Sequence, residues 1–117
     1  MKTYIRIVGD DIPNDPLCVV VDWNAPYFPR VGDLFGYRFL LANIDPEDFY
    51  SVLLDDVRKE MLDSVNWRKH GLNDKDIKKE ILRSYVTEWQ FRISDIYWDM
   101  NENSECEAYV WVRIETF

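Results

Sequence analysis

The sequence is poor in the residues on which several common protein classes depend. It has two cysteines, one histidine and four glycines in 117 residues, and no apolar run approaches the roughly 20 residues of a membrane-spanning helix. Neither Cys18 nor Cys106 belongs to a CxxC pair. A domain of 117 residues can bury a core of its own, so stability requires no disulfide framework or metal. The N-terminus reaches an aspartate before any apolar stretch attains signal-peptide length, and we therefore expect a cytoplasmic protein with two free thiols.

Basic residues are also in deficit. The chain has 14 lysines and arginines against 22 aspartates and glutamates, which gives a formal net charge of −8. A negative field repels the phosphate backbone, so nucleic acid is disfavoured as a partner. The hydrophobic fraction of 47% and charged fraction of 31% are typical of a globular protein and argue against disorder. Residues 1–117 fit one domain.

Extended segments rich in β-branched residues predict about five strands, mostly antiparallel. They are residues 4–8, 17–23, 34–41, 89–98 and 106–115. Residues 101–104 predict a hairpin turn between the last two strands. The apolar residues of these two strands fall on the same face only if the strand at residues 89–98 carries one extra residue. We therefore expect a β-bulge at Ser94-Asp95, with Ile93 opposite Val110. Because a bulge promotes bending, the pattern is compatible with a sheet that curls into a partial barrel.

Two helix starts interrupt the strands and predict a helical insertion over residues 45–84. Asp45 and Asn73 occupy positions where a side chain caps free helix amides, and Pro46 occupies a first helical position. After the first cap, apolar residues recur at every fourth position from Phe49 to Val65, which predicts one amphipathic helix. The expected fold class is therefore α+β, with two helices inserted between the third and fourth strands.

No catalytic constellation is recognisable. His70 lies near a predicted helix C-terminus, where a histidine is electrostatically favourable, so a structural role is favoured over catalysis. Residues 99–105 alternate oxygen-bearing side chains like the start of a calcium loop, but Ser104 replaces the required glycine and Val110 replaces the bidentate glutamate. A solvated hairpin turn is favoured there, and neither a metal site nor a cofactor is predicted.

Two charged clusters leave other functions open. Asp10, Asp11 and Asp15 share one loop, where carboxylates can bind a divalent ion or transfer protons, although a solvated acidic loop is favoured. A basic segment follows later in the chain, and its members are Lys69, Lys75, Lys78, Lys79 and Arg83. Acidic residues are interspersed among them, which favours a solvated helix face over a phosphate-binding patch.

The last predicted strand has aromatic residues on the face that its apolar residues do not use. Tyr109 and Trp111 alternate with the apolar set and therefore need separate cover. The candidate partner-binding residues on this face are Arg92, Tyr97, Tyr109, Trp111 and Arg113. Aromatic residues and arginine are enriched in interface hot spots. The competing hypothesis is that the inserted helices cover this face, which is favoured because sheets often bury both faces.

These features favour a non-catalytic interaction or accessory module over an enzyme. The expected partner is another protein or a second copy of the chain, as in a homodimer, with no membrane involved. Two alternatives remain: a metal-dependent enzyme that uses the loop carboxylates, and an acidic nucleic-acid mimic that binds a basic protein.

Overall fold

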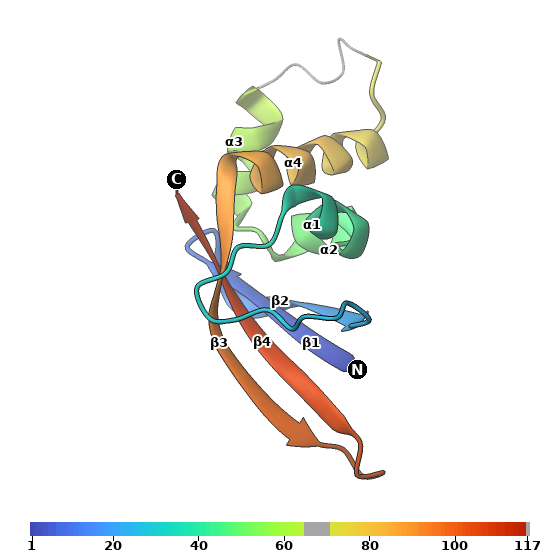
Figure 1. Ribbon diagram of the computed structural model, residues 1–117. Helices are drawn as coiled ribbons and strands as arrows, with labels where there is room; N and C mark the ends of the chain where they lie inside the picture. Colours follow the sequence, from blue (N-terminus) through green and yellow to red (C-terminus); the bar gives the residue numbers. More distant parts are fainter. Residues whose placement is uncertain (65–70, 117) are drawn as a thin grey trace.

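A computed structural model describes residues 1–64 and 71–116 of the chain. The elements follow in the order β1 (Lys2–Gly9), β2 (Ile12–Asp22), α1 (Tyr37–Asn43), α2 (Pro46–Val52), α3 (Asp55–Ser64), α4 (Asp74–Glu88), β3 (Trp89–Met100) and β4 (Cys106–Thr116) (Figure 1). The predicted α+β class is confirmed. His70 and Lys69 lie outside the described residues, so the roles expected for them stay predictions.

The four strands form one mixed sheet in the order β2-β1-β4-β3. The two hairpins are antiparallel, whereas the central strands β1 and β4 run parallel, with Ile5 opposite Val110. Parallel neighbours need a long crossover connection, and the helices lie within it. Because β2 and β3 lie at opposite edges, the sheet is open and the partial barrel is not formed.

The predicted third strand at residues 34–41 is wrong. Tyr37–Asn43 forms helix α1, and of the predicted strand only Leu34 makes an isolated bridge, to Arg92 on β3. Leu40 and Ile44 lie four residues apart and are both buried, which is helical spacing. A short apolar run fits a strand and a helix equally well, so its sequence alone did not separate them. The helical segment consequently begins before residue 45 and ends at Glu88.

The single helix predicted after Asp45 is two helices. The backbone of Leu53 is extended, with φ −68° and ψ 149°, and ends α2, although its side chain is buried. The next amide, of Leu54, donates to the Asp11 carbonyl in the β1–β2 turn at 2.9 Å. The break therefore fastens the helices to the sheet through a contact between distant parts of the chain.

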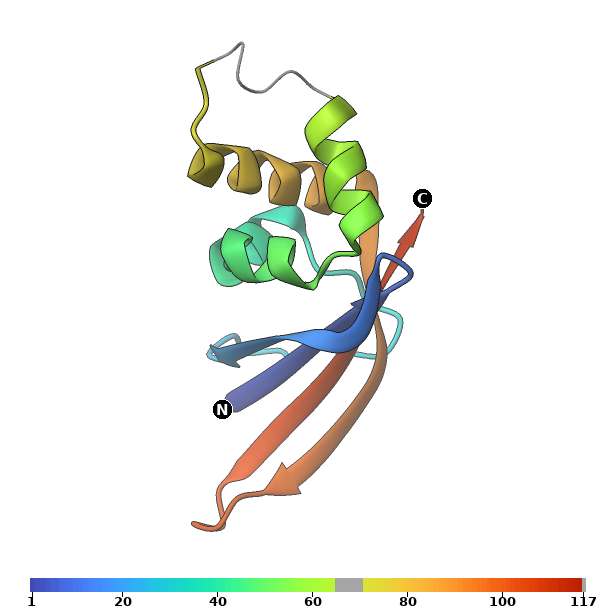
Figure 2. The ribbon, with the colours of Figure 1, turned by 180° about the vertical axis from the view of Figure 1, so that it is seen from behind.

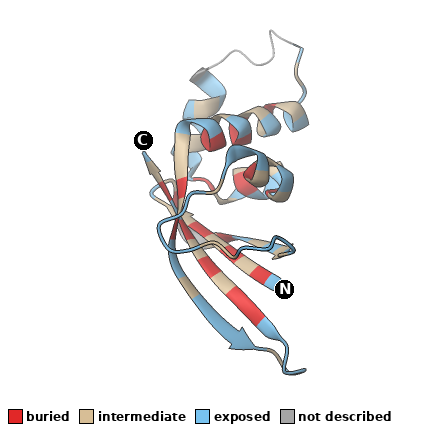
Figure 3. Cartoon of the chain, viewed as in Figure 1, coloured by how far each residue is buried: buried red, intermediate tan, exposed pale blue. Residues whose placement is uncertain are grey.

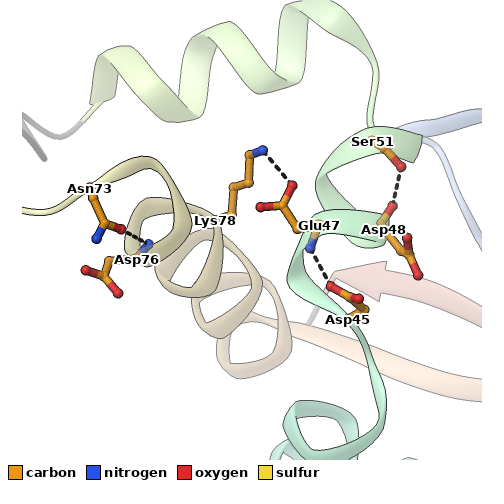
Figure 4. A network of polar contacts seen from close by, with 7 residues as sticks. All are labelled: Asp45, Glu47, Asp48, Ser51, Asn73, Asp76 and Lys78. Atoms are coloured by element: carbon orange, nitrogen blue, oxygen red, sulfur yellow. Dashed lines mark hydrogen bonds and ion pairs between the residues drawn. The ribbon is translucent and has the colours of Figure 1, made fainter.

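Both predicted helix caps are confirmed, as Figure 4 shows. The Asp45 carboxylate accepts a hydrogen bond from the Glu47 amide at 2.9 Å. The Asn73 side chain accepts one from the Asp76 amide at 2.9 Å. Each cap satisfies an amide that has no partner within its helix.

The β3–β4 hairpin contains the predicted bulge, between Ile93 and Asp95. The predicted register is two residues out, since Ile93 pairs with Val112 and not with Val110. A shift of two residues keeps every side chain on its predicted face, because side chains in a strand alternate with period two.

The loop at residues 101–105 explains the register. The Asn101 side chain accepts hydrogen bonds from the amides of Asn103, at 2.9 Å, and Glu105, at 3.0 Å. These local bonds close the loop tightly and leave Met100 opposite Cys106 as the last strand pair. The Asn101 oxygen, which resembled a calcium ligand in the sequence, therefore closes a turn.

One hydrophobic core lies between the helices and one face of the sheet (Figure 3). Phe49 on α2 and Ile81 on α4 are fully buried in the same core cluster as Ile5 and Val110 of the central strands. The helices gather at one end of the sheet, and the turn end of the β3–β4 hairpin projects away from them (Figure 2). No helix within residues 1–64 and 71–116 is long and apolar enough to cross a bilayer.

Candidate functional site

The face of the sheet turned away from the helical core carries large side chains from three strands. We call this set the outer face; its members are Tyr4, Arg6, Tyr97, Tyr109 and Trp111. The strand register places Tyr109 between Tyr4 and Tyr97, and Arg6 beside Trp111. Because the alternate residues of these strands point into the core, the outer-face residues point away from it.

Three tyrosines form a stacked row across the outer face. The ring centroids of Tyr4 and Tyr109 are 4.9 Å apart, and those of Tyr97 and Tyr109 are 4.8 Å apart, with interplanar angles of 11° and 4°. The Arg6 guanidinium lies 5.4 Å from the Trp111 ring centroid and 5.7 Å from that of Tyr109. Cation–π contacts of this kind contribute about 0.5–1 kcal/mol at exposed sites. The sheet itself therefore holds these side chains in fixed positions.

The hypothesis that the inserted helices cover this face is wrong. The helix residues expected to do so were Phe49, Leu53, Val57 and Ile81. The first two and Ile81 belong to the core on the other side of the sheet, and Val57 packs against that core. The apolar side chains of the helices pack against the core face of the sheet and therefore do not cover the opposite face.

The register places all five predicted partner-binding residues on one face of the β3–β4 hairpin, with Arg92 directly opposite Arg113. Tyr97, Tyr109 and Trp111 are neighbours, as expected. Arg113 pairs with Asp10, with 3.5 Å between Nη2 and Oδ1. Arg92 donates to the Gly32 carbonyl at 2.7 Å and contacts Glu115 at 3.2 Å, so it fastens the loop before α1 to β3. Partner binding by these residues stays a prediction.

Sequence reasoning missed Tyr4, Arg6 and Glu107. The alternation of residues 4–8 predicted a strand, and it placed Tyr4 and Arg6 on one face of that strand. This alternation did not indicate which strand lies beside residues 4–8. That strand is β4, which lies near the other end of the sequence and pairs with β1 in parallel. Glu107 lies on the same face of β4 as Tyr109 and Trp111 and is buried there.

The acidic loop is used for structure. The Tyr85 hydroxyl donates to the Asp11 carboxylate at 2.5 Å, and burial, followed by this bond, raises the pKa of Tyr85. Asp10 pairs with Arg113, while the Asp15 side chain lies outside the description. Within the described part of the chain, no three histidine, cysteine or acidic side chains come together to hold a metal.

The basic segment on α4 also takes part in packing contacts. The Lys78 ammonium lies 2.7 Å from the Glu47 carboxylate and 5.0 Å from the Tyr50 ring centroid, which joins α4 to α2 (Figure 4). The hydrogen bond to Glu47 is the main reason that the pKa of Lys78 is raised. Arg83 pairs with Glu80 at 3.6 Å on the surface of the helix.

An open hollow of about 580 Å³ lies in the loop after β2. Its lining residues are Trp23, Pro26, Tyr27, Phe28, Pro29, Arg30 and Asp33. The Trp23 indole donates to the Tyr27 carbonyl at 2.8 Å, and Asp33 accepts from the Arg30 amide at 2.8 Å. These polar groups hold the loop in shape.

Comparisons with protein-family models, curated proteins and solved structures found no match to this chain. A function therefore has to follow from the geometry of the molecule itself, and the outer face is the surface that departs most from an ordinary solvated sheet.

Proposed function

We propose that the protein is a non-catalytic interaction module that binds a protein partner through the outer face. The observation that supports this is the row of stacked tyrosines, with Arg6 and Trp111 beside it, on a sheet face outside the helical core. A sheet face that ordinarily meets water carries polar side chains in alternation with the core residues. Large aromatic residues in a contiguous group mark interaction sites instead.

The energetics of binding favour the same surface. Tyrosine, tryptophan and arginine dominate interface hot spots because they bury large areas and also donate hydrogen bonds. Stacking between Tyr4, Tyr109 and Tyr97 fixes the rings before any partner arrives, so little side-chain entropy is lost on association. A second copy of the chain is one partner that the face suits, and it would make a homodimer.

A matched pair of variants tests the proposal. Tyr97→Ala removes the outer ring of the row, which is 41% exposed, whereas Tyr37→Ala removes a ring of similar exposure, 47%, on α1. We expect immobilised wild type and Tyr37→Ala to retain one partner from a cell extract and Tyr97→Ala to lose it. Sedimentation of the pure protein shows whether that partner is a second copy. Equal retention by all three proteins would refute binding through the outer face.

A further inference from the structure

The turn end of the β3–β4 hairpin combines carboxylates with exposed aromatic side chains. Residues 94–108 contain no lysine or arginine, and their acidic residues are Asp95, Asp99, Glu102, Glu105 and Glu107. Tyr97 and Trp98 are 41% and 50% exposed in the same segment. The hairpin end projects away from the helices, so it is accessible to another molecule (Figures 1 and 2).

Glu107 is the carboxylate in this hairpin whose bonding capacity is unmet. Its side chain is buried, at 7% exposure, and its Oε2 atom has no hydrogen-bond partner among the described residues. The register places it directly opposite Asp99, and like charges on facing strand positions repel. The exposed ammonium of Lys2 lies 5.2 Å from the Tyr4 ring centroid. The pKa of Lys2 is raised mainly by its hydrogen bond to Tyr4 and to a smaller extent by the charge of Glu107, so Lys2 attracts Glu107 without supplying the missing hydrogen bond. A buried carboxylate oxygen that accepts no hydrogen bond lowers folding stability, and a donor supplied by a ligand would offset that cost.

Two of the outward-facing amides at this edge of β3 already have acceptors within the strand. The Asp95 carboxylate accepts from the Ile96 amide at 2.9 Å, and the Asp99 carboxylate accepts from the Met100 amide at 2.8 Å. Amides that are already bonded to neighbouring carboxylates are not free to pair with another chain. These bonds disfavour extension of the sheet at this edge and leave the side chains of the outer face as the better surface for a partner.

We infer that the partner of the outer face is a basic protein segment, which places a lysine or arginine side chain against Glu107 and Asp99 beside the Tyr97 ring. The inference rests on the proposed function. A cation there pairs with the exposed Asp99 carboxylate and reduces its repulsion with Glu107, and its aliphatic stem packs on an aromatic surface. The buried Glu107 oxygen accepts from the same cation once the side chains that cover it, among them the exposed Lys2, move aside. The absence of positive charge from residues 94–108 makes a basic segment the complementary partner.

Octalysine is the probe, and calorimetric titration at low salt is the measurement. We expect wild type to bind octalysine and not its fully acetylated form. Glu107→Gln keeps the shape of the side chain and should weaken binding by roughly 30-fold, as expected when one member of a buried charge pair is lost. Glu88→Gln makes the same chemical change at an exposed position of α4 and should leave the affinity unaltered. Equal affinity of wild type and Glu107→Gln would overturn the inference, as would tighter binding of spermine than of octalysine, which would indicate a free polyamine.

The stability of Glu107→Gln keeps the test interpretable. The substitution removes a buried charge and its repulsion with Asp99, and it also removes the attraction to the exposed Lys2. Because solvent screens the attraction to Lys2, we expect the variant to unfold at a higher denaturant concentration than wild type. Asp99→Asn, at an exposed position, provides a second variant that should weaken octalysine binding without loss of the fold. A partner that depends on Tyr97 but binds Glu107→Gln normally would refute the inference and leave the proposed function standing. Retention that is independent of Tyr97 would refute the proposed function itself.

Discussion

The two faces of the sheet differ in what shields their side chains from water. On the core face, Ile5 and Val110 are 2% and 1% exposed because they belong to the core that the sheet shares with the crossover helices. On the outer face, their neighbours Tyr4 and Tyr109 are only partly buried and shield one another by stacking. Residues one position apart therefore have different roles: the core residues stabilise the fold, and the outer residues are ordered by the fold without being essential to it.

The largest effect should come from the core face. Phe49 on α2 is fully buried, and its ring packs edge-on to that of Tyr85 with centroids 5.1 Å apart. We expect Phe49→Ala to lower the free energy of unfolding by about 4 kcal/mol, because it leaves a cavity that the core cannot fill. Urea denaturation measures this, with Tyr37→Ala on α1 as an exposed aromatic control that should change the value by less than about 0.5 kcal/mol. A similar small loss for both variants would show that the helices are not part of the core.

The next effect concerns the bond that joins α4 to the β1–β2 turn. Tyr85→Phe removes the hydroxyl that donates to Asp11 at 2.5 Å and keeps the ring contacts. A hydrogen bond to a charged group contributes more than a neutral one, so we expect a loss of about 2 kcal/mol at neutral pH. No change in the denaturation midpoint would mean that water replaces the hydroxyl without cost.

The same bond predicts a dependence on pH. Burial and the bond to Asp11 raise the pKa of Tyr85 in the folded protein, whereas in the unfolded chain it is about 10. A raised folded pKa contributes stability that is fully present below the unfolded pKa and is lost as the pH rises above it. Wild type should therefore lose more stability than Tyr85→Phe between pH 9 and pH 11, so that the difference between them narrows. A constant difference across this range would contradict the assignment.

A smaller effect is expected at the start of α2. Asp45→Ala removes the carboxylate that accepts from the Glu47 amide, and it should lower the free energy of unfolding by about 1 kcal/mol. Asp48→Ala also removes an acidic residue from the first turn but not the cap, and a change of about 0.3 kcal/mol is expected. Equal losses for the two variants would indicate a general charge effect and not capping.

The smallest effect is expected from reduction. Cys18 on β2 and Cys106 on β4 are unlinked and exposed, with β1 between their strands. Thiol titration of the denatured, unreduced protein should find two free groups, and a reducing agent should leave the denaturation midpoint unchanged. An intramolecular link detected by mass would contradict this.

Local features of the fold were predictable from the sequence. The caps at Asp45 and Asn73 depend on residues within three positions, and the bulge follows from the mismatch of two apolar patterns. The exposure of Cys18 and Cys106 was not expected from their apolar neighbours, because an apolar run does not say which of its residues meets the core.

Features that depend on distant contacts were not predictable. The break at Leu53 is completed by a hydrogen bond from the next amide to the Asp11 carbonyl, which no helical periodicity reveals. The outer face depends on the parallel pairing of β1 with β4, and only this pairing brings Tyr4 and Arg6 to Tyr109. The sequence of the last strand therefore indicated Tyr109 and Trp111 as candidate site residues, whereas Tyr4 and Arg6 could be added only from the tertiary structure.

The free energy of unfolding of Trp111→Ala tests most directly whether the outer face is separate from the core. Trp111 is partly buried beside Arg6 and lies on the outer face, away from the helical core. We predict a loss of about 1–2 kcal/mol, in proportion to its partly buried area, with the fold retained. A loss of about 4 kcal/mol, equal to that expected for Phe49→Ala, would show that Trp111 belongs to the core and would contradict an outer face available to a partner.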